Sequence, residues 1–410
     1  MTAPAPQNRA AYHPSSNAPG LSVQPAPYPR PGPHDLVLRN AAVALNPIDY
    51  IMQTRGSLVL PGITYPFVLG SDVAGTVVEV GSAVTRFRPG DRACGYAAGS
   101  DPKCRSRTGS GHGAKDQSRG NGNAEGGFQL YTVVAEDAAS PVPESITLAQ
   151  AATLPMGVLT AACGLFDKAQ LGLRLPRTPA TADGEKPRSG FGGQDQGRSG
   201  GREVVLIWGG STSVGCNAIQ LASAAGYDVV TTCSPRNFDL VRSLGAAHAF
   251  DYGSGVAVVV DDIVAAIGSR RVAGALAIGA QSATRCMDVL AGCQGRKFVS
   301  MVTFPMPEDP NAGILYSVLV YVVGNIGLII KSLRTGVKRG LAISTSILHN
   351  DVGKAIWADY LPEALQRKCY VAAPEPMVVG SGLENIQQGL ELLKKGVSAR
   401  KVVVDLSGES

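Results

Sequence analysis

The pattern of apolar and polar positions divides the chain into two kinds of segment. Up to about residue 155, short apolar runs alternate with glycine and proline turns, as is typical of a small β-rich domain. From about residue 156, apolar runs alternate with helical periodicity, which predicts an α/β segment with a doubly wound parallel sheet. Its strands are expected at 203–208, 228–232, 247–250, 272–278 and 296–302.

In the β-rich segment, Arg9–Tyr12 and Leu21–Val23 are expected to form a hairpin. The alternate prolines from Pro25 to Pro33 predict an extended linker, because a proline ring cannot donate to a strand ladder. Longer apolar runs predict the other strands at 36–45, 72–81, 92–96 and 128–134.

Further elements follow residue 343. A helix is expected at 350–365 with Asn350 as its cap, a second helix at 382–395 and a strand at 400–405.

The most informative stretch joins the strand at 203–208 to the helical pattern at 216–225. A glycine loop between a strand and a helix can present backbone N–H groups to a pyrophosphate. The dinucleotide fingerprint spaces its first and third glycines as Gly210 and Gly215 are spaced, but its middle glycine is replaced here by Thr212. The expected cofactor contacts are Gly210, Ser211, Thr212, Ser213, Val214 and Gly215; the alternative is a purely structural turn.

The residues after the second strand of this unit indicate which dinucleotide binds. NAD-specific folds usually place an acid there to hold the ribose 2′-hydroxyl. This chain instead has Ser234, Pro235, Arg236 and Asn237, and an arginine can pair with a 2′-phosphate. We therefore expect NADPH, although the same four residues could simply cap the helix that starts near Phe238.

Composition narrows the picture only a little. The 410 residues carry a net charge of +5, which lies in residues 99–126 and 173–202. The polar tracts 99–126 and 173–201 are expected to be mobile surface loops, with a solvated His112 in the first. No basic helix suggests a nucleic-acid partner. The eight cysteines form no Cys-x-x-Cys pair and no secretory pattern opens the chain, so a cytoplasmic location is expected.

One apolar run, Gly313–Ile330, contains no charge and is followed by several cations. Its length is at the threshold for a membrane span, but Asn325 and three glycines interrupt it. We expect a buried or lid-like helix pair near the substrate cavity. Shallow membrane association stays open as a less favoured alternative.

Several motifs occur together in one order. They are Asn46–Asp49, Leu69–Val77, Val84–Arg92, the loop at 209–215, Thr231–Leu240 and Lys395–Val404. With them the chain resembles the medium-chain dehydrogenase/reductases, in particular the zinc-independent fungal branch of trans-acting enoyl reductases and quinone-oxidoreductase-like dehydrogenases. The resemblance implies a Rossmann sheet at 156–343 inserted in a split, GroES-like catalytic domain formed by 1–155 and 344–410.

Zinc-dependent members of that superfamily hold a catalytic metal with a cysteine and a Gly-His-Glu segment. The corresponding places here are Leu45–Pro47 and Gly70–Asp72, which contain neither cysteine nor histidine, and the first polar tract offers only Cys104 toward a structural zinc lobe. The sequence therefore predicts no zinc.

Without a metal, hydride addition to a conjugated C=C bond is favoured, because the carbonyl then needs only a hydrogen-bond donor and an acid protonates the α-carbon. The resemblance places the Asn-Pro-x-Asp segment against nicotinamide and substrate, which implicates Ile48 and Ile51 in cofactor binding and Asp49 and Tyr50 in catalysis. Many relatives carry lysine at the position of Ile51. Tyr50 is the candidate acid; the alternative is a packing role, with solvent supplying the proton.

The resemblance implies further cofactor contacts. They are Thr160 at the carboxamide, Tyr252 near the adenosine phosphates, Ile278 and Gly279 beneath the nicotinamide, and Val402 and Val403 from the returning C-terminal strand. Thr160 could instead bond to the backbone of its own helix.

The expected activity is NADPH-dependent reduction of an activated double bond in a polyketide or other secondary-metabolite intermediate, free or carried on a polyketide synthase. Two alternatives stay open: a zinc-independent carbonyl or quinone reductase, and a non-catalytic NADPH-binding scaffold or sensor. A monomer or a homodimer is expected.

Overall fold

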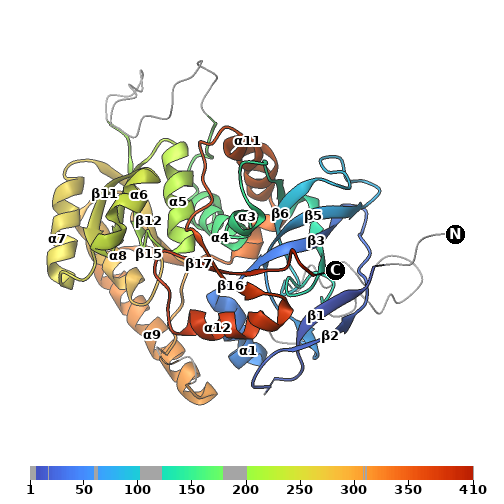
Figure 1. The fold of residues 1–410 in the computed structure, drawn as a ribbon. Coiled ribbons are helices and arrows are strands. Elements are labelled where there is room, and N and C mark those ends of the chain that lie inside the picture. Colours follow the sequence, from blue (N-terminus) through green and yellow to red (C-terminus); the bar gives the residue numbers. More distant parts are fainter. Residues whose placement is uncertain are drawn as a thin grey trace. The chain divides into compact units, whose positions relative to one another are not determined.

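The computed structural model describes residues 6–16, 18–59, 63–101, 122–178, 201–307, 309 and 312–409 (Figure 1). The expectations for most of the two polar tracts, including Cys104 and His112, lie outside these residues. The chain divides into unit 1, Met1–Met156 with Ala372–Ser410, and unit 2, Gly157–Val371.

The second boundary lies after Val371 rather than after residue 343, where the sequence placed it. The reason is that the helical segment after Asn350 packs within unit 2. The Tyr370 hydroxyl, for example, donates a hydrogen bond to the Asn217 side-chain oxygen of that unit at 2.6 Å.

Unit 1 is β-rich. Strands β1 (Asn8–His13) and β2 (Ser22–Ala26) form the expected antiparallel hairpin, and β4 (Phe67–Val68) pairs with the other edge of β1. Pro25 belongs to β2, opposite Arg9, so the proline linker begins later than expected. The larger sheet has the order β16 (Pro376–Ser381), β17 (Lys401–Asp405), β3 (Asp35–Ala44), β5 (Asp72–Val80), β6 (Arg92–Tyr96) and β8 (Ala139–Pro141), with β7 (Tyr131–Ala135) also paired to β3.

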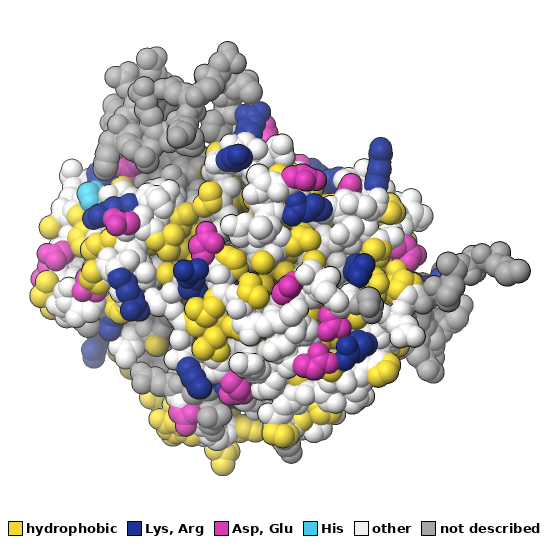
Figure 2. Space-filling model, in the orientation of Figure 1, with side chains coloured by type: hydrophobic (Ala, Val, Ile, Leu, Met, Phe, Trp, Pro, Cys, Tyr) yellow, Lys and Arg dark blue, Asp and Glu magenta, His cyan; other side chains and the backbone are white. Residues whose placement is uncertain are grey.

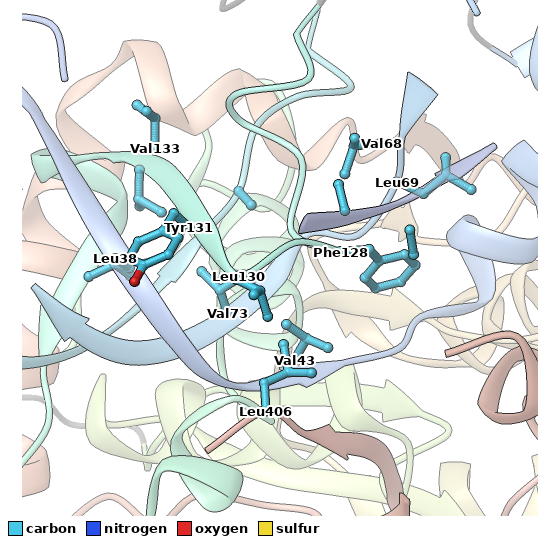
Figure 3. Close-up of a cluster of buried hydrophobic side chains, with 14 of the residues drawn as sticks. Leu38, Val43, Val68, Leu69, Val73, Phe128, Leu130, Tyr131, Val133 and Leu406 are labelled. Carbon is cyan, nitrogen blue, oxygen red and sulfur yellow. The ribbon is translucent and has the colours of Figure 1, made fainter. Parts of the chain in front are cut away.

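Strand β17 brings the C-terminal segment back into unit 1. It runs antiparallel to β3, with Val404 opposite Val43. Figure 3 shows side chains from both ends of the chain in one core, where Leu406 lies beside Val43. The helical segments of this unit are α1 (Pro47–Val59), η1 (Glu136–Ala138), α3 (Leu148–Ala151), η5 (Leu383–Asn385) and α12 (Ile386–Lys394).

Unit 2 contains the doubly wound sheet. Its strands are all parallel, in the order β11 (Ala246–Asp251), β10 (Asp228–Cys233), β9 (Val204–Trp208), β12 (Arg271–Ala277), β14 (Phe298–Met301) and β15 (Lys338–Leu341), with β13 (Gln294–Gly295) beside β12. The central strand β9 is buried throughout, as a continuous apolar run in a parallel sheet should be. The edge strand β15 was not predicted, because its sequence Lys-Arg-Gly-Leu gives little strand signal.

Helices connect these strands. They are α4 (Pro155–Phe166), α5 (Ser213–Ala224), η2 (Pro235–Asn237), α6 (Phe238–Ser243), α7 (Val256–Ile267), α8 (Ser282–Gly292), α9 (Ile314–Thr335), η3 (Ser344–His349), α10 (Asp351–Lys354), the π-helical turn η4 (Ala355–Tyr360) and α11 (Leu361–Gln366). Asn350 caps α10 as expected, accepting a hydrogen bond from the Val352 N–H at 3.0 Å.

The prediction of a buried or lid-like helix pair at 313–330 is wrong in the number of helices and in the burial, whereas a lid-like role near the substrate cavity stays a prediction. The segment forms one continuous helix, α9, in which only Ser317 and Leu328 are buried. Two stretches in the described part of the chain, Leu148–Phe166 and Ile314–Thr335, are long and apolar enough to cross a membrane, but the first is largely buried in the fold. Apolar length alone could not say which side of α9 faces the protein.

Candidate functional site

Close backbone approaches explain the glycines of the loop between β9 and α5. A Cβ on Gly210 would come within 2.1 Å of the Thr231 hydroxyl, and one on Gly215 within 2.2 Å of the Gly209 carbonyl oxygen. Gly209 has a φ of +90°, which only glycine adopts readily. The backbone of the loop is therefore packed too closely for side chains at Gly210 and Gly215. The first turn of α5, which follows the loop, offers backbone N–H groups suited to an anion.

Thr212, at the place of the middle glycine, is the N-cap of α5. Its hydroxyl accepts a hydrogen bond from the Gly215 N–H at 3.0 Å and donates one to the Gly209 carbonyl at 2.8 Å. The departure from the glycine pattern thus supplies a helix cap. The neighbouring Ser211 and Val214 are half-buried.

Ser213 differs from the other predicted loop contacts. Its side-chain oxygen is buried, and a Cβ on Gly157 of α4 would come within 2.8 Å of it. The hydroxyl therefore faces α4, and Ser213 can offer a ligand its backbone N–H only.

The ends of β10 and β11 meet at two hydroxyl groups. The Ser234 hydroxyl lies 3.0 Å from that of Tyr252, which is 45% exposed. Pro235 and Arg236 are exposed in the turn η2, and Asn237 is buried. An exposed guanidinium two residues after Ser234 in the chain suits a phosphate monoester.

The C-terminal end of β12 lies next to the glycine loop. A Cβ on Gly209 would come within 2.9 Å of the Ile278 carbonyl oxygen. Gly279 has a φ of +101°, and its N–H donates to the Thr303 hydroxyl at 2.6 Å. Ile278 and Gly279 therefore belong to the same strand-end region as the loop, where open α/β sheets bind ligands.

Thr160 is buried in α4, at 7% exposure.

In unit 1, the Asn-Pro-x-Asp motif forms the turn into α1. The Asp49 carboxylate accepts a hydrogen bond from the Asn46 backbone N–H at 2.8 Å, and the Asp49 N–H donates to the Asn46 carbonyl at 3.0 Å. Asp49 is only 1% exposed. Burial raises its pKa to about 7, against the opposing Asn46 hydrogen bond. This placement makes Asp49 a positioning residue of the turn.

A buried ion pair holds the same turn. The Lys401 ammonium lies 2.8 Å from the Asp72 carboxylate and donates to the Asn46 side-chain oxygen at 2.5 Å. The Asn46 side-chain amide donates to Asp72 at 2.9 Å, and the Met156 N–H donates to the other Asp72 oxygen at 2.6 Å. The side chains of Asn46, Asp72 and Lys401 thus each hydrogen-bond within this cluster, as burial requires.

These residues do not fit a zinc ion. The Lys401 ammonium already neutralises Asp72 and would repel a divalent cation. Burial raises the pKa of the nearby Cys94 thiol to about 12, with Asp72 adding to the rise, so no thiolate is available. Among the described residues, no three His, Cys, Asp or Glu side chains are grouped as metal ligands.

The other predicted residues of unit 1 flank this cluster. Tyr50 and Ile48 are half-buried against the core of the unit, and Ile51 is half-buried one residue further along α1. Burial raises the pKa of the Tyr50 phenol, so it keeps its proton at neutral pH.

Val402 and Val403 are fully buried in β17. The Val402 carbonyl accepts a hydrogen bond from the Leu45 N–H at 2.9 Å. The strand thus fixes the backbone just before the Asn46–Asp49 turn.

Lys401 and the side chain of Asn46 were not predicted from the sequence as site residues. The sequence did contain a signal for this pair. Lys401 and Asp72 each stand at the start of an apolar run, and a charged residue in a buried strand needs a partner of opposite charge. Only the pairing of β17 with β3 and of β3 with β5 brings them together.

Known proteins resemble this chain over nearly its whole length. Residues 32–144 match the family described as alcohol dehydrogenase GroES-like domain. The chain is 46% identical to the dehydrogenase pigH of Monascus ruber, over 98% of this chain and 100% of that protein. It is 34% identical to the trans-enoyl reductase himH of Aspergillus japonicus, over 98% of each. Among solved structures, the CurK enoyl reductase has the same fold, with a TM-score of 0.66 at 17% identity over 98% of this chain and 99% of that one.

Proposed function

Because this chain belongs to the medium-chain dehydrogenase/reductase superfamily and is an oxidoreductase with a nicotinamide cofactor, we propose that it uses NADPH to reduce an activated C=C bond. The proposed substrate is an enone or enoyl intermediate of secondary metabolism. Relatives named trans-enoyl reductases support this substrate class.

The choice of reaction rests on the Lys401–Asp72 ion pair. The Lys401 ammonium contacts Asn46 and Asp72. These two residues lie in the segments that correspond to the metal-binding segments of zinc-dependent relatives. A substrate carbonyl can then be polarised only by hydrogen bonds, which suffice when hydride adds at the β-carbon of a conjugated system.

The choice of NADPH rests on the end of β10. From Val229 to Phe238 the chain contains no acid that could hold a ribose 2′-hydroxyl. Arg236 and Ser234 would instead hold a 2′-phosphate, and the first turn of α5 would hold the pyrophosphate.

When bound, the reduced nicotinamide supplies the hydride. The protein itself would orient the substrate and the nicotinamide and would supply a proton. Asn46, Asp49 and Lys401 hold the start of α1, which carries Tyr50. The protonated Tyr50 phenol would deliver the proton to the α-carbon.

Stopped-flow oxidation of NADPH tests the proposal, with a panel of enones and α,β-unsaturated thioesters, the matching saturated ketones, and quinones. We expect turnover with the conjugated substrates, and deuterium from labelled NADPH at the β-carbon of the product. Oxidation by ketones or quinones alone would contradict the proposal, as would tight NADPH binding without turnover by any acceptor.

A further inference from the structure

Helix α9 exposes large apolar side chains over almost its whole length. These side chains form what we call the α9 apolar face: Ile314, Leu315, Tyr316, Val318, Leu319, Tyr321, Val322, Val323, Ile326, Ile329, Ile330 and Leu333. In Figure 2, apolar side chains gather at the lower edge of the molecule, where Figure 1 places α9. The face amounts to on the order of 1,000 Å², whereas an ordinary monomer exposes apolar patches of a few hundred.

The opposite side of α9 anchors the helix to unit 2. Gly324 lies against Pro305, where an added Cβ would come within 2.5 Å of the proline ring. Lys331 forms an ion pair with Asp288 of α8. Apart from the buried Leu328, small and polar residues face the protein on this side, whereas most large apolar residues of α9 face outward. A surface helix usually buries its apolar side instead.

The width of the face indicates what kind of partner covers it. At about 100° per residue, its members span an arc of roughly 200° around the helix. A partner helix would cover only a narrow seam. A wide arc suits a fluid apolar medium that surrounds the helix, as the acyl chains of a lipid layer do.

The charges at the C-terminal end of α9 favour anionic lipid. From Ile314 to Thr335 the helix contains no Asp or Glu. Arg334 is exposed in its last turn, and Lys338 is exposed just beyond it. Such cations beside an apolar surface are attracted to anionic headgroups.

We propose that α9 inserts its apolar face into the surface layer of a membrane that contains anionic phospholipids. The helix lies in the membrane plane rather than across it, because α8 packs against it. Arg334 and Lys338 then lie at headgroup level. At the membrane surface the enzyme would meet an apolar substrate that has partitioned into the lipid layer.

Co-sedimentation of the full chain with sucrose-loaded vesicles tests the proposal. We expect more than half of the protein to pellet with phosphatidylcholine vesicles containing one-third phosphatidylserine, and severalfold less with phosphatidylcholine alone. The variant Leu315→Glu/Leu319→Glu/Val322→Glu places three charges in the apolar face and should abolish pelleting. Because these side chains are exposed, the variant should fold and bind NADPH as the unchanged chain does.

A matched control places the same three charges at other exposed apolar positions of unit 2, as Leu175→Glu/Val258→Glu/Val371→Glu. This variant should pellet like the unchanged chain. The proposal fails if the unchanged chain stays in the supernatant, or if both triple variants lose binding equally. It also fails if light scattering shows a dimer that the α9 variant dissociates, because the face would then join two copies.

Discussion

The ammonium of Lys401 lies 2.8 Å from the carboxylate of Asp72, and their side chains are 5% and 0% exposed. The two residues come from strands on either side of β3, so the pair joins segments from opposite ends of the chain. Because both charges are buried, each depends on the other and on Asn46.

Replacing Lys401 by Met should lower the free energy of unfolding by about 3–5 kcal/mol, because Asp72 would be left buried and uncompensated. Urea denaturation followed by circular dichroism measures the change. Adding Asp72→Asn to Lys401→Met should restore part of the loss. As a control, Lys354→Met breaks the exposed pair with Asp359 and should change stability by less than about 1 kcal/mol. Equal losses in both single variants would contradict the assigned role.

Replacing Arg236 by Ala should weaken NADPH binding about 10- to 100-fold and leave NADH binding almost unchanged, because one charge-assisted contact to the 2′-phosphate is lost. Fluorescence titration with each cofactor measures both dissociation constants. Arg242→Ala is the control, because Arg242 stacks on Phe238 in α6 and should not affect cofactor choice. An unchanged preference in Arg236→Ala would refute NADPH selection at this turn.

Replacing Gly210 by Ala should abolish dinucleotide binding, because the new Cβ would collide with the Thr231 hydroxyl and displace the loop. The expected cost in stability is about 1–3 kcal/mol. Calorimetric titration and thermal unfolding measure the two effects. Gly327→Ala in α9 is the control, because the new Cβ would meet open space. This variant should leave dinucleotide binding unchanged, and it should leave stability unchanged or raise it slightly.

The raised pKa of Asp49 predicts how stability depends on pH. The folded chain keeps a proton on this carboxyl up to about pH 7, whereas the unfolded chain releases it near pH 4. The free energy of unfolding contributed by Asp49 is therefore greatest below pH 4 and falls as the pH rises from 4 through 7. Asp49→Asn should remove this slope in urea titrations, and the exposed Asp137→Asn should not. Parallel curves for the Asp49 variant and the unchanged chain would exclude the effect.

Replacing Tyr50 by Phe should lower kcat about 100-fold for an enone, with little change in KM, if the phenol supplies the proton. Steady-state kinetics across pH provides the measurement. Tyr28→Phe removes the hydroxyl of a half-buried tyrosine elsewhere in unit 1 and serves as the control. An unaltered kcat would assign protonation to solvent and leave Tyr50 a packing role.

The elements that could be predicted are those whose signals are local. The strand β9, the glycine loop and helix α5 were predicted from the apolar run of β9 and the spacing of Gly210 and Gly215. These signals lie in consecutive residues, so they do not depend on which distant segments become neighbours. The Lys401–Asp72 pair was missed because it depends on which distant strands become neighbours. The burial of α9 was predicted wrongly, because apolar composition does not reveal that Gly324 and Lys331 hold its inner side.

The antiparallel pairing of β3 with β17 also determines when unit 1 can form during synthesis. The strand β3 is synthesised early, but Val404 can pair with Val43 only after all of unit 2, which lies between them in the sequence, has been synthesised. Until then the β3 segment Ala42, Val43 and Ala44 lacks its β17 neighbour, while the Rossmann sheet can already assemble. A nascent chain in this state should need chaperone protection, and a truncation before β17 should cause aggregation instead of a milder loss of activity.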